Sequence, residues 1–173
     1  KGYKDRVGDG WSELKSLGPM IDRKDWYIMR LSASSKGTYV FDEATREGNG
    51  VLRYSRLING KREEPKPLNK EINAGKWTAH PFIAPDESYL IWDSEVEAGF
   101  GGTDIYISYR QKDGSWGPAI NMGDKINTAH SEKNPSLSPD GQFLFFDKRT
   151  KRGNEEVNIY WVDAQIIETL RPK

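Results

Sequence analysis

The chain repeats a tight turn, an aromatic-rich run and a closing aspartate three times. The segments are ASSKGTYVFD at 33–42, APDESYLIWD at 84–93 and SPDGQFLFFD at 138–147. A period of about 50 residues is typical of arrays in which each repeat is one supersecondary unit. This internal repetition constrains the architecture more than any single segment does.

Two further landmarks repeat in the same order. The run NIYW at 158–161 matches DIYI at 104–107, which in turn matches GVLR at 50–53. The pair Ile-Asn at 126–127 matches the same pair at 72–73. The offset is the same in all of these matches. Three landmarks in one order indicate a true structural repeat.

Each unit is expected to contain four short strands, A to D, separated by turns. For the middle unit the pattern predicts strand A at 80–84, strand B at 89–94, strand C at 104–110 and strand D at 116–122. Proline presets φ in the turn before strand B, and Gly141 accepts a positive φ there. Four antiparallel strands in each repeat form the blade of a β-propeller, so the predicted fold class is all-β.

The repeat divides the chain into blade units at 29–76, 77–128 and 129–162, within a single propeller domain or the C-terminal half of one. Segment 11–17 is predicted to be one more D strand. Segment 163–171 is predicted to be a short helical tail, capped by Asp163, with Ile166, Ile167 and Leu170 on one face.

The strand inventory leaves the last unit without a D strand, although segment 11–17 could supply one. Three units are fewer than the roughly four to eight blades of known propellers. We favour a chain that is half of a six-bladed propeller, because 1–9 resembles the end of a C strand whose A and B strands are missing. A second copy closing the ring by two-fold symmetry is the next alternative, and an open arc of blades is the third.

Composition narrows the possible partners and cofactors. The 173 residues carry 26 basic and 26 acidic side chains, no cysteine and two histidines. A net charge near zero disfavours nucleic acid as a partner, and no apolar run is long enough to insert into a membrane. No cofactor or metal site is expected, because the histidines occupy non-equivalent positions, although calcium held by carboxylates and carbonyls stays open.

Several segments resemble the WD40-like (PD40) repeats of TolB-like β-propeller proteins. They are NPSLSPDGQFLFFD, GGTDIYISYRQKDGSWGPAINMG and NIYWVDAQIIETLRP, and the likeness is strong over 77–172 and weaker over 29–73. The resemblance implies a bacterial, periplasmic or secreted protein, a propeller that is often six-bladed, and a role in protein association. Similar blades also occur in polysaccharide lyases and beside prolyl-type peptidases.

Antiparallel order places the B–C and D–A loops on one face, which we call the long-loop rim. Its loops span 45–49, 95–103 and 148–156, together with 70–76 and 124–133. Binding residues concentrate on loops that a rigid scaffold presents. The candidate ligand-binding residues at the mouth of the central channel are Arg30, Trp77, His80, His130, Glu132 and Asn134. The alternative is that these groups only satisfy neighbouring loop amides.

Asp42, Asp93 and Asp147 end strand B in all three units, and we expect them to accept backbone N–H groups rather than to act in catalysis. Catalytic carboxylates need two different environments.

The leading hypothesis is a non-catalytic propeller module that binds a protein or glycan through the long-loop rim. The alternative is a polysaccharide-acting enzyme that draws carboxylates from Glu95, Glu97, Asp104, Glu132 and Glu155, and a structural spacer is a third possibility.

Overall fold

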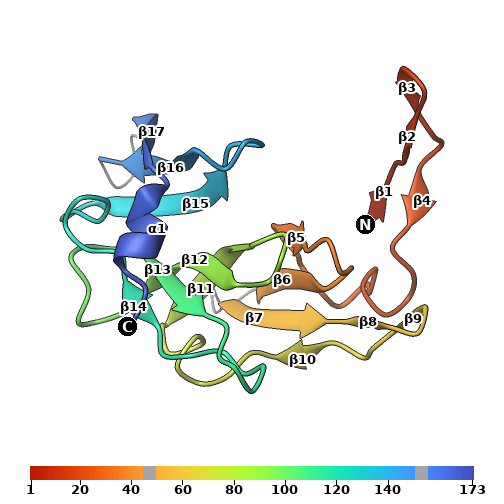
Figure 1. The fold of residues 1–173 in the computed structure, drawn as a ribbon, viewed down its shortest axis with the longest axis horizontal. Helices are drawn as coiled ribbons and strands as arrows, with labels where there is room; N and C mark the ends of the chain where they lie inside the picture. The colour runs from red at the N-terminus through yellow and green to blue at the C-terminus, as the bar shows by residue number, and fades with distance from the viewer. Residues whose placement is uncertain (45–49, 151–155) are drawn as a thin grey trace.

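The computed structural model describes residues 1–44, 50–150 and 156–173. Antiparallel strands dominate these residues, and α1 (Gln165–Thr169) is their one helix. The sheets follow one another along an arc, with the N-terminal strands at one end and β17 at the other (Figure 1). This arrangement confirms the predicted all-β fold class and the short C-terminal helix.

The first blade is a four-stranded sheet with the strand order β5-β6-β7-β10. Its strands are β5 (Leu31–Ala33), β6 (Tyr39–Ala44), β7 (Gly50–Ser55) and β10 (Lys66–Pro67). A hairpin of β8 (Leu57–Ile58) and β9 (Lys61–Arg62) joins the last two strands.

The second blade contains β11 (Trp77–Ile83), β12 (Tyr89–Glu95), β13 (Asp104–Tyr109) and β14 (Ile120–Asn121), in that order. All four predicted strands are present, but strand D is shorter than the expected 116–122. Trp116 makes only an isolated bridge to Arg110, and Pro118 has no N–H to donate to a ladder.

The third blade contains β15 (Ser131–Leu137), β16 (Phe143–Arg149) and β17 (Val157–Asp163). Within the described residues this sheet has three strands, so the expected shortage of a D strand is present in the structure. The predicted B–C loops at 45–49 and, in part, at 148–156 lie outside the described residues.

The N-terminal half-blade, residues 1–22, contains β1 (Gly2–Tyr3), β2 (Arg6–Val7), β3 (Gly10–Trp11) and β4 (Lys15–Ser16). β4 pairs with β1, and β3 pairs with β2. Segment 11–17 therefore does not complete the third blade within one chain, which the strand inventory leaves open. The edge of segment 11–17 that would pair with a C strand is already paired with residues 2–7, the segment that resembles a C strand.

Apolar side chains fill the space between successive blades. Leu52 from the first blade packs with Leu90 and Trp92 from the second, and all three are at most 1% exposed. Ile105 and Ile107 from the second blade are fully buried in a cluster that continues into the third blade. Burying each such side chain stabilises the fold by about 1.5–3 kcal/mol, so the stacking of blades is the main apolar term.

An asparagine after strand D clamps strand C in both complete blades. The Asn127 side chain accepts the N–H of Ile105 (2.8 Å) and donates to its carbonyl (2.9 Å). Asn73 makes the same pair of bonds to Leu52, at 2.8 and 3.1 Å. Leu52 is thus the counterpart of Ile105, and the predicted match of GVLR to DIYI is wrong by one residue. A one-residue shift would reverse the buried face, which is why the clamp fixes the true register.

The C-terminal helix packs onto the second and third blades. Ile167 is 3% exposed and joins the apolar cluster with Ile107. The Tyr109 hydroxyl donates to the Ile167 carbonyl, and burial raises the pKa of Tyr109 to about 12. Asp163 accepts the N–H of Gln165 at 2.8 Å. In the part of the chain that the structure describes, no helix is long and apolar enough to cross a membrane.

We expect Asn127→Ala to lower the free energy of unfolding by about 2–4 kcal/mol, because it removes two bonds to a buried strand and leaves a buried N–H unpaired. Denaturant unfolding measures this change. The matched control is Asn158→Ala, since Asn158 is exposed on β17. Equal losses for the two variants would contradict the clamp.

Candidate functional site

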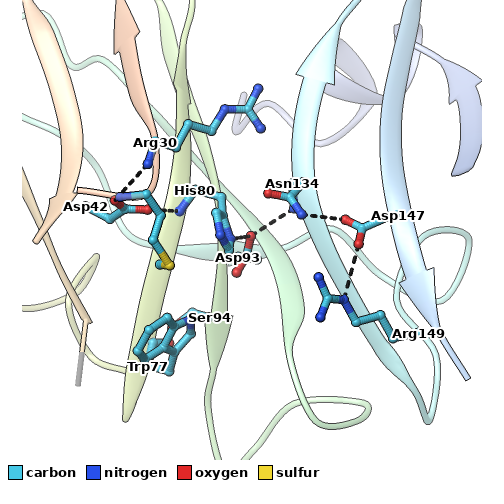
Figure 2. A network of polar contacts seen from close by, with 10 residues as sticks. Arg30, Asp42, Trp77, His80, Asp93, Ser94, Asn134, Asp147 and Arg149 are labelled. Carbon is cyan, nitrogen blue, oxygen red and sulfur yellow. Dashed lines mark hydrogen bonds and ion pairs between the residues drawn. The ribbon is translucent and has the colours of Figure 1, made fainter. Parts of the chain in front are cut away.

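The three repeated aspartates lie on strand B of successive blades, next to strand A, and belong to one hydrogen-bonded network (Figure 2). Asp42 and Asp93 are fully buried and Asp147 is 8% exposed. Each lies two residues before the end of its strand, in β6, β12 and β16 respectively, rather than at the strand end that the sequence suggests. The strands therefore hold these carboxylates rigidly inside the scaffold.

Asp42 joins the first blade to the second. Its Oδ1 accepts the N–H groups of Met29 (2.7 Å) and Arg30 (3.0 Å), which precede strand A of its own blade. Its Oδ2 accepts the N–H of His80, in strand A of the next blade, at 2.9 Å. One buried carboxylate thus connects the inner strands of two blades.

Asp93 joins the second blade to the third in a similar way. Its Oδ1 lies 2.8 Å from His80 Nδ1 in its own blade and accepts the N–H of Asn134, in the next blade, at 3.0 Å. Its Oδ2 is buried without a hydrogen-bond partner among the described residues. Complete burial raises the pKa of Asp93, although the bonds from His80 and Asn134 act to lower it.

The network continues into the third blade at Asp147. Asn134 Nδ2 donates to Asp147 Oδ1 at 2.8 Å, and Arg149 Nε lies 3.4 Å from Oδ2. Asn134 therefore uses its backbone for the preceding blade and its side chain for its own blade. His80 divides its backbone and side chain between Asp42 and Asp93 in the same way.

Backbone geometry directs these N–H groups at the carboxylates. His80 and Asn134 have φ angles of 48° and 56°, at bulges where the pairing of strands A and B shifts. Positive φ is uncommon outside glycine but enriched for Asn and His. Both residues also precede a proline, which disfavours the right-handed helical region for the residue before it. The sequence signal of this geometry is that His80-Pro81 and Asn134-Pro135 occupy equivalent positions in their repeats.

Arg30 occupies the corresponding place in the first blade, but its side chain behaves differently. Its guanidinium points away from Asp42 (Figure 2). Burial lowers the pKa of Arg30, while the charges of Asp93, Asp42 and Asp147 act to raise it. Arg30 is thus a half-buried cation whose backbone N–H is bonded to Asp42. Its guanidinium is close enough to interact electrostatically with all three carboxylates.

The other candidate residues do not join this network. Trp77 is half-buried, its carbonyl accepts the Ser94 hydroxyl at 2.9 Å, and its indole N–H is buried without a partner among the described residues. His130 is exposed on the long-loop rim, where its carbonyl accepts the N–H of Gly102 at 2.8 Å. The structure therefore gathers Arg30, His80 and Asn134 but leaves Trp77 and His130 apart.

Glu132 is fully buried, and its carboxylate is occupied. It accepts the Thr128 N–H (2.9 Å) and hydroxyl (2.6 Å) and lies 3.7 Å from Lys148 Nζ. Its backbone N–H also donates to Thr103 of the second blade at 2.8 Å. These contacts give Glu132 a role in fixing the loop before strand A.

The carboxylates considered for hydrolysis are in unequal settings. Asp104 is 1% exposed and accepts the Phe100 N–H (2.6 Å) and Asn121 Nδ2 (2.8 Å). Glu95 lies 4.0 Å from Lys76 on the surface, and Glu155 lies outside the described residues. Among the described residues, no group of three or more His, Asp or Glu side chains is arranged to hold a metal ion.

Successive antiparallel blades along an arc define the fold class of this protein as that of a β-propeller. Two solved structures carry the comparison further: a protein described as a TolB from Agrobacterium tumefaciens and TolB from Acinetobacter baumannii. They are 16% and 17% identical to this chain, each with a TM-score of 0.56. The matches cover 83% and 88% of this chain, which spans 47% and 35% of theirs. The fold is that of a TolB-like β-propeller, and this chain is equivalent to half or less of those structures.

A thermostable family-43 glycoside hydrolase also matches, at 19% identity over 92% of this chain and 66% of that one. Its TM-score of 0.48 is too low to carry an argument about activity. No protein-family model matches the chain, and no curated protein matches it either.

We expect Asp93→Ala to lower the free energy of unfolding by about 3 kcal/mol, because hydrogen bonds to a charged group are worth about 1.5–3 kcal/mol each. The control is Asp147→Ala, which removes the same group from the same strand position but no N–H bond from a following blade. We expect a smaller loss, because Asp147 is less buried than Asp93 and its contacts with Asn134 and Arg149 lie within its own blade. Chemical denaturation compares the two, and an equal effect would show that the bond between blades adds nothing.

Proposed function

We propose that the chain is a non-catalytic propeller module that binds a protein or glycan through its long-loop rim. The observation that carries this proposal is that the buried carboxylates are bonded within the scaffold, whereas polar and aromatic groups at the rim remain available to a ligand. Both carboxylate oxygens of Asp42 and of Glu132 accept hydrogen bonds within the scaffold, and one oxygen of Asp93 does so while its other oxygen is buried. The groups left for a ligand are side chains at the rim and the guanidinium of Arg30.

Exposed aromatic side chains on the rim support a binding role. Phe100, in the B–C loop of the second blade, is 51% exposed. Tyr27, which bridges to Ala44 at the end of strand B, is 67% exposed. His130 is exposed in the D–A loop before the third blade. Aromatic side chains are favoured at interfaces because they bring a large apolar area with few rotatable bonds.

A cavity between the first two blades favours a protein over a glycan. Its volume is about 320 Å³, and Trp92 and Tyr106 line it as a stacked pair with centroids 6.2 Å apart. Ile72 and Val96 complete an apolar wall beside the rim loops. Such a pocket suits a single apolar side chain of a partner, the usual anchor of a protein interface.

The polysaccharide-enzyme alternative would require Arg30, His80 or Glu132 to act on a substrate. His80 Nδ1 is engaged by Asp93, and the Glu132 carboxylate is engaged by Thr128 and Lys148. General acid–base catalysis needs a group within reach of the substrate proton. These contacts favour binding without turnover.

The TolB-like fold also supports a location outside the cytoplasm, in the periplasm or secreted. Fractionation of cells that express the protein in its native host tests this part of the proposal. Recovery with cytoplasmic markers would contradict it.

We expect Arg30→Ala and Phe100→Ala to weaken ligand binding about tenfold each, or about 1.4 kcal/mol, with unfolding unchanged. The probe is a photo-crosslinking amino acid placed at Tyr27 in the native host, which covalently traps the partner for identification and titration. Arg110→Ala is the control, because Arg110 lies over Trp116 at the opposite rim (4.9 Å).

Binding reduced equally by Arg110→Ala would contradict the rim as the site. Turnover of a polysaccharide panel that Arg30→Ala abolishes, with the fold intact, would replace the proposal with the enzyme alternative.

A further inference from the structure

The outer face of the third blade matches a face that is buried in the second blade. Ile159 and Trp161 on β17 are 77% and 59% exposed. Their counterparts one repeat earlier, Ile105 and Ile107, are 0% exposed because the third blade covers them. Phe143 packs edge-on against Trp161, with centroids 5.0 Å apart, and extends the apolar surface. The interface between the second and third blades thus predicts that this exposed face should pack against another blade.

The outer edge of β17 is also without a neighbouring strand. β17 pairs with β16, and no strand of the described residues pairs with its other edge. In the second blade, β13 uses that edge to pair with β14, with Ile107 opposite Ile120 and Tyr106 opposite Asn121. An open edge beside exposed aromatic residues is a template for another strand.

The N-terminal half-blade contains a D strand in the same register. Lys15 lies opposite Tyr3 and Ser16 opposite Gly2, as Ile120 and Asn121 lie opposite β13. Arg6 lies over Trp11 at 5.4 Å, as Arg110 lies over Trp116 at 4.9 Å.

The turn after this strand also matches the second blade. Gly18 and Gly123 have φ angles of 86° and 80°. Each glycine carbonyl accepts the N–H groups three and four residues later, and the isoleucines there, Ile21 and Ile126, are at most 1% exposed. Residues 10–18 thus have the conformation and turn of a blade's D strand.

This D strand is held mainly by polar contacts at the surface. The two ladders of the half-blade join two residue pairs each, Lys15 pairs with Asp5, and all four strands of the half-blade are exposed. Trp11 and Leu14 are 64% and 69% exposed. The half-blade projects away from the other sheets in Figure 1. Exchange to a longer, apolar partner strand would bury surface that is now in water.

We propose that a second copy of this chain occupies the open edge of β17, with each chain giving its residues 10–17 to the third blade of the other. Lys15 of the partner subunit would lie opposite Trp161, and Ser16 of the partner subunit opposite Tyr160. The exchange is reciprocal, as two-fold symmetry requires. Within the described residues, each copy has a third blade of three strands and a D strand that lies outside a four-stranded sheet, and two copies can pair these with each other. The zero net charge removes long-range repulsion between copies.

The test uses the full chain, which has no cysteine of its own. Light scattering should give twice the mass of one chain, with dissociation on dilution. Oxidised Lys15→Cys/Trp161→Cys should run as a covalent dimer, because directly opposed positions have Cβ atoms close enough for a disulfide. Lys15→Cys/Arg110→Cys, with the second cysteine far from β17, should not.

A staple separates strand exchange from other modes of association. Tyr3→Cys/Lys15→Cys joins two positions that are opposite within one half-blade. When oxidised it should hold the chain as a monomer, and reduction should restore the dimer. A monomeric parent chain, a dimer that survives the oxidised staple, or the failure of the Lys15–Trp161 cross-link within a dimer would each overturn the proposal. Loss of rim binding alone would affect only the proposed function, because residues 10–17 and β17 do not form the rim.

Discussion

The blades of this chain are joined at their inner edges by buried carboxylates that accept main-chain N–H groups from the following blade. Asp42 receives the N–H of His80, and Asp93 receives that of Asn134. An apolar interface between sheets is nearly non-directional. These hydrogen bonds add the direction that the apolar contact lacks and fix how one blade is positioned against the next.

The same bonds explain why His80 and Asn134 stabilise the scaffold, since their polar groups are already bonded to the aspartates. A carboxylate buried without partners would be strongly destabilising, so each buried aspartate needs donors, and strand A supplies them. His80 and Asn134 adopt an uncommon positive φ to do so. Arg30 differs, because its backbone serves Asp42 and its guanidinium does not. The proposed function follows from this contrast.

Much of the fold was predictable from the repeat, because turn residues and alternating apolar runs are local signals. The strands of the second blade and the short helix were found in this way. The register of strand C in the first blade was not, because it depends on the contact of Asn73 with Leu52 across 21 residues. The pairing of 11–17 with 2–7 was likewise hidden, since the sequence shows a D-strand pattern but not its partner.

The candidate site was predictable only in part. Position in the repeat indicated Arg30, His80 and Asn134, and a structural role for the aspartates was expected. That the aspartates bind the next blade could not be inferred, because the relevant contacts span 38 and 41 residues and depend on how the sheets stack. The His80-Pro81 and Asn134-Pro135 dipeptides indicated an unusual backbone at these positions. Only the structure shows that this backbone directs N–H groups at Asp42 and Asp93.

Native-state hydrogen exchange of the His80 and Asn134 amides tests this account most directly. If their N–H groups are held by Asp42 and Asp93, they should be protected almost as well as the amide of Ile105, at the centre of the second blade, and should exchange only when blades separate. Exchange as fast as that of amides in the exposed Asp113–Ser115 turn, with Ile105 still protected, would show that the carboxylates do not join the blades.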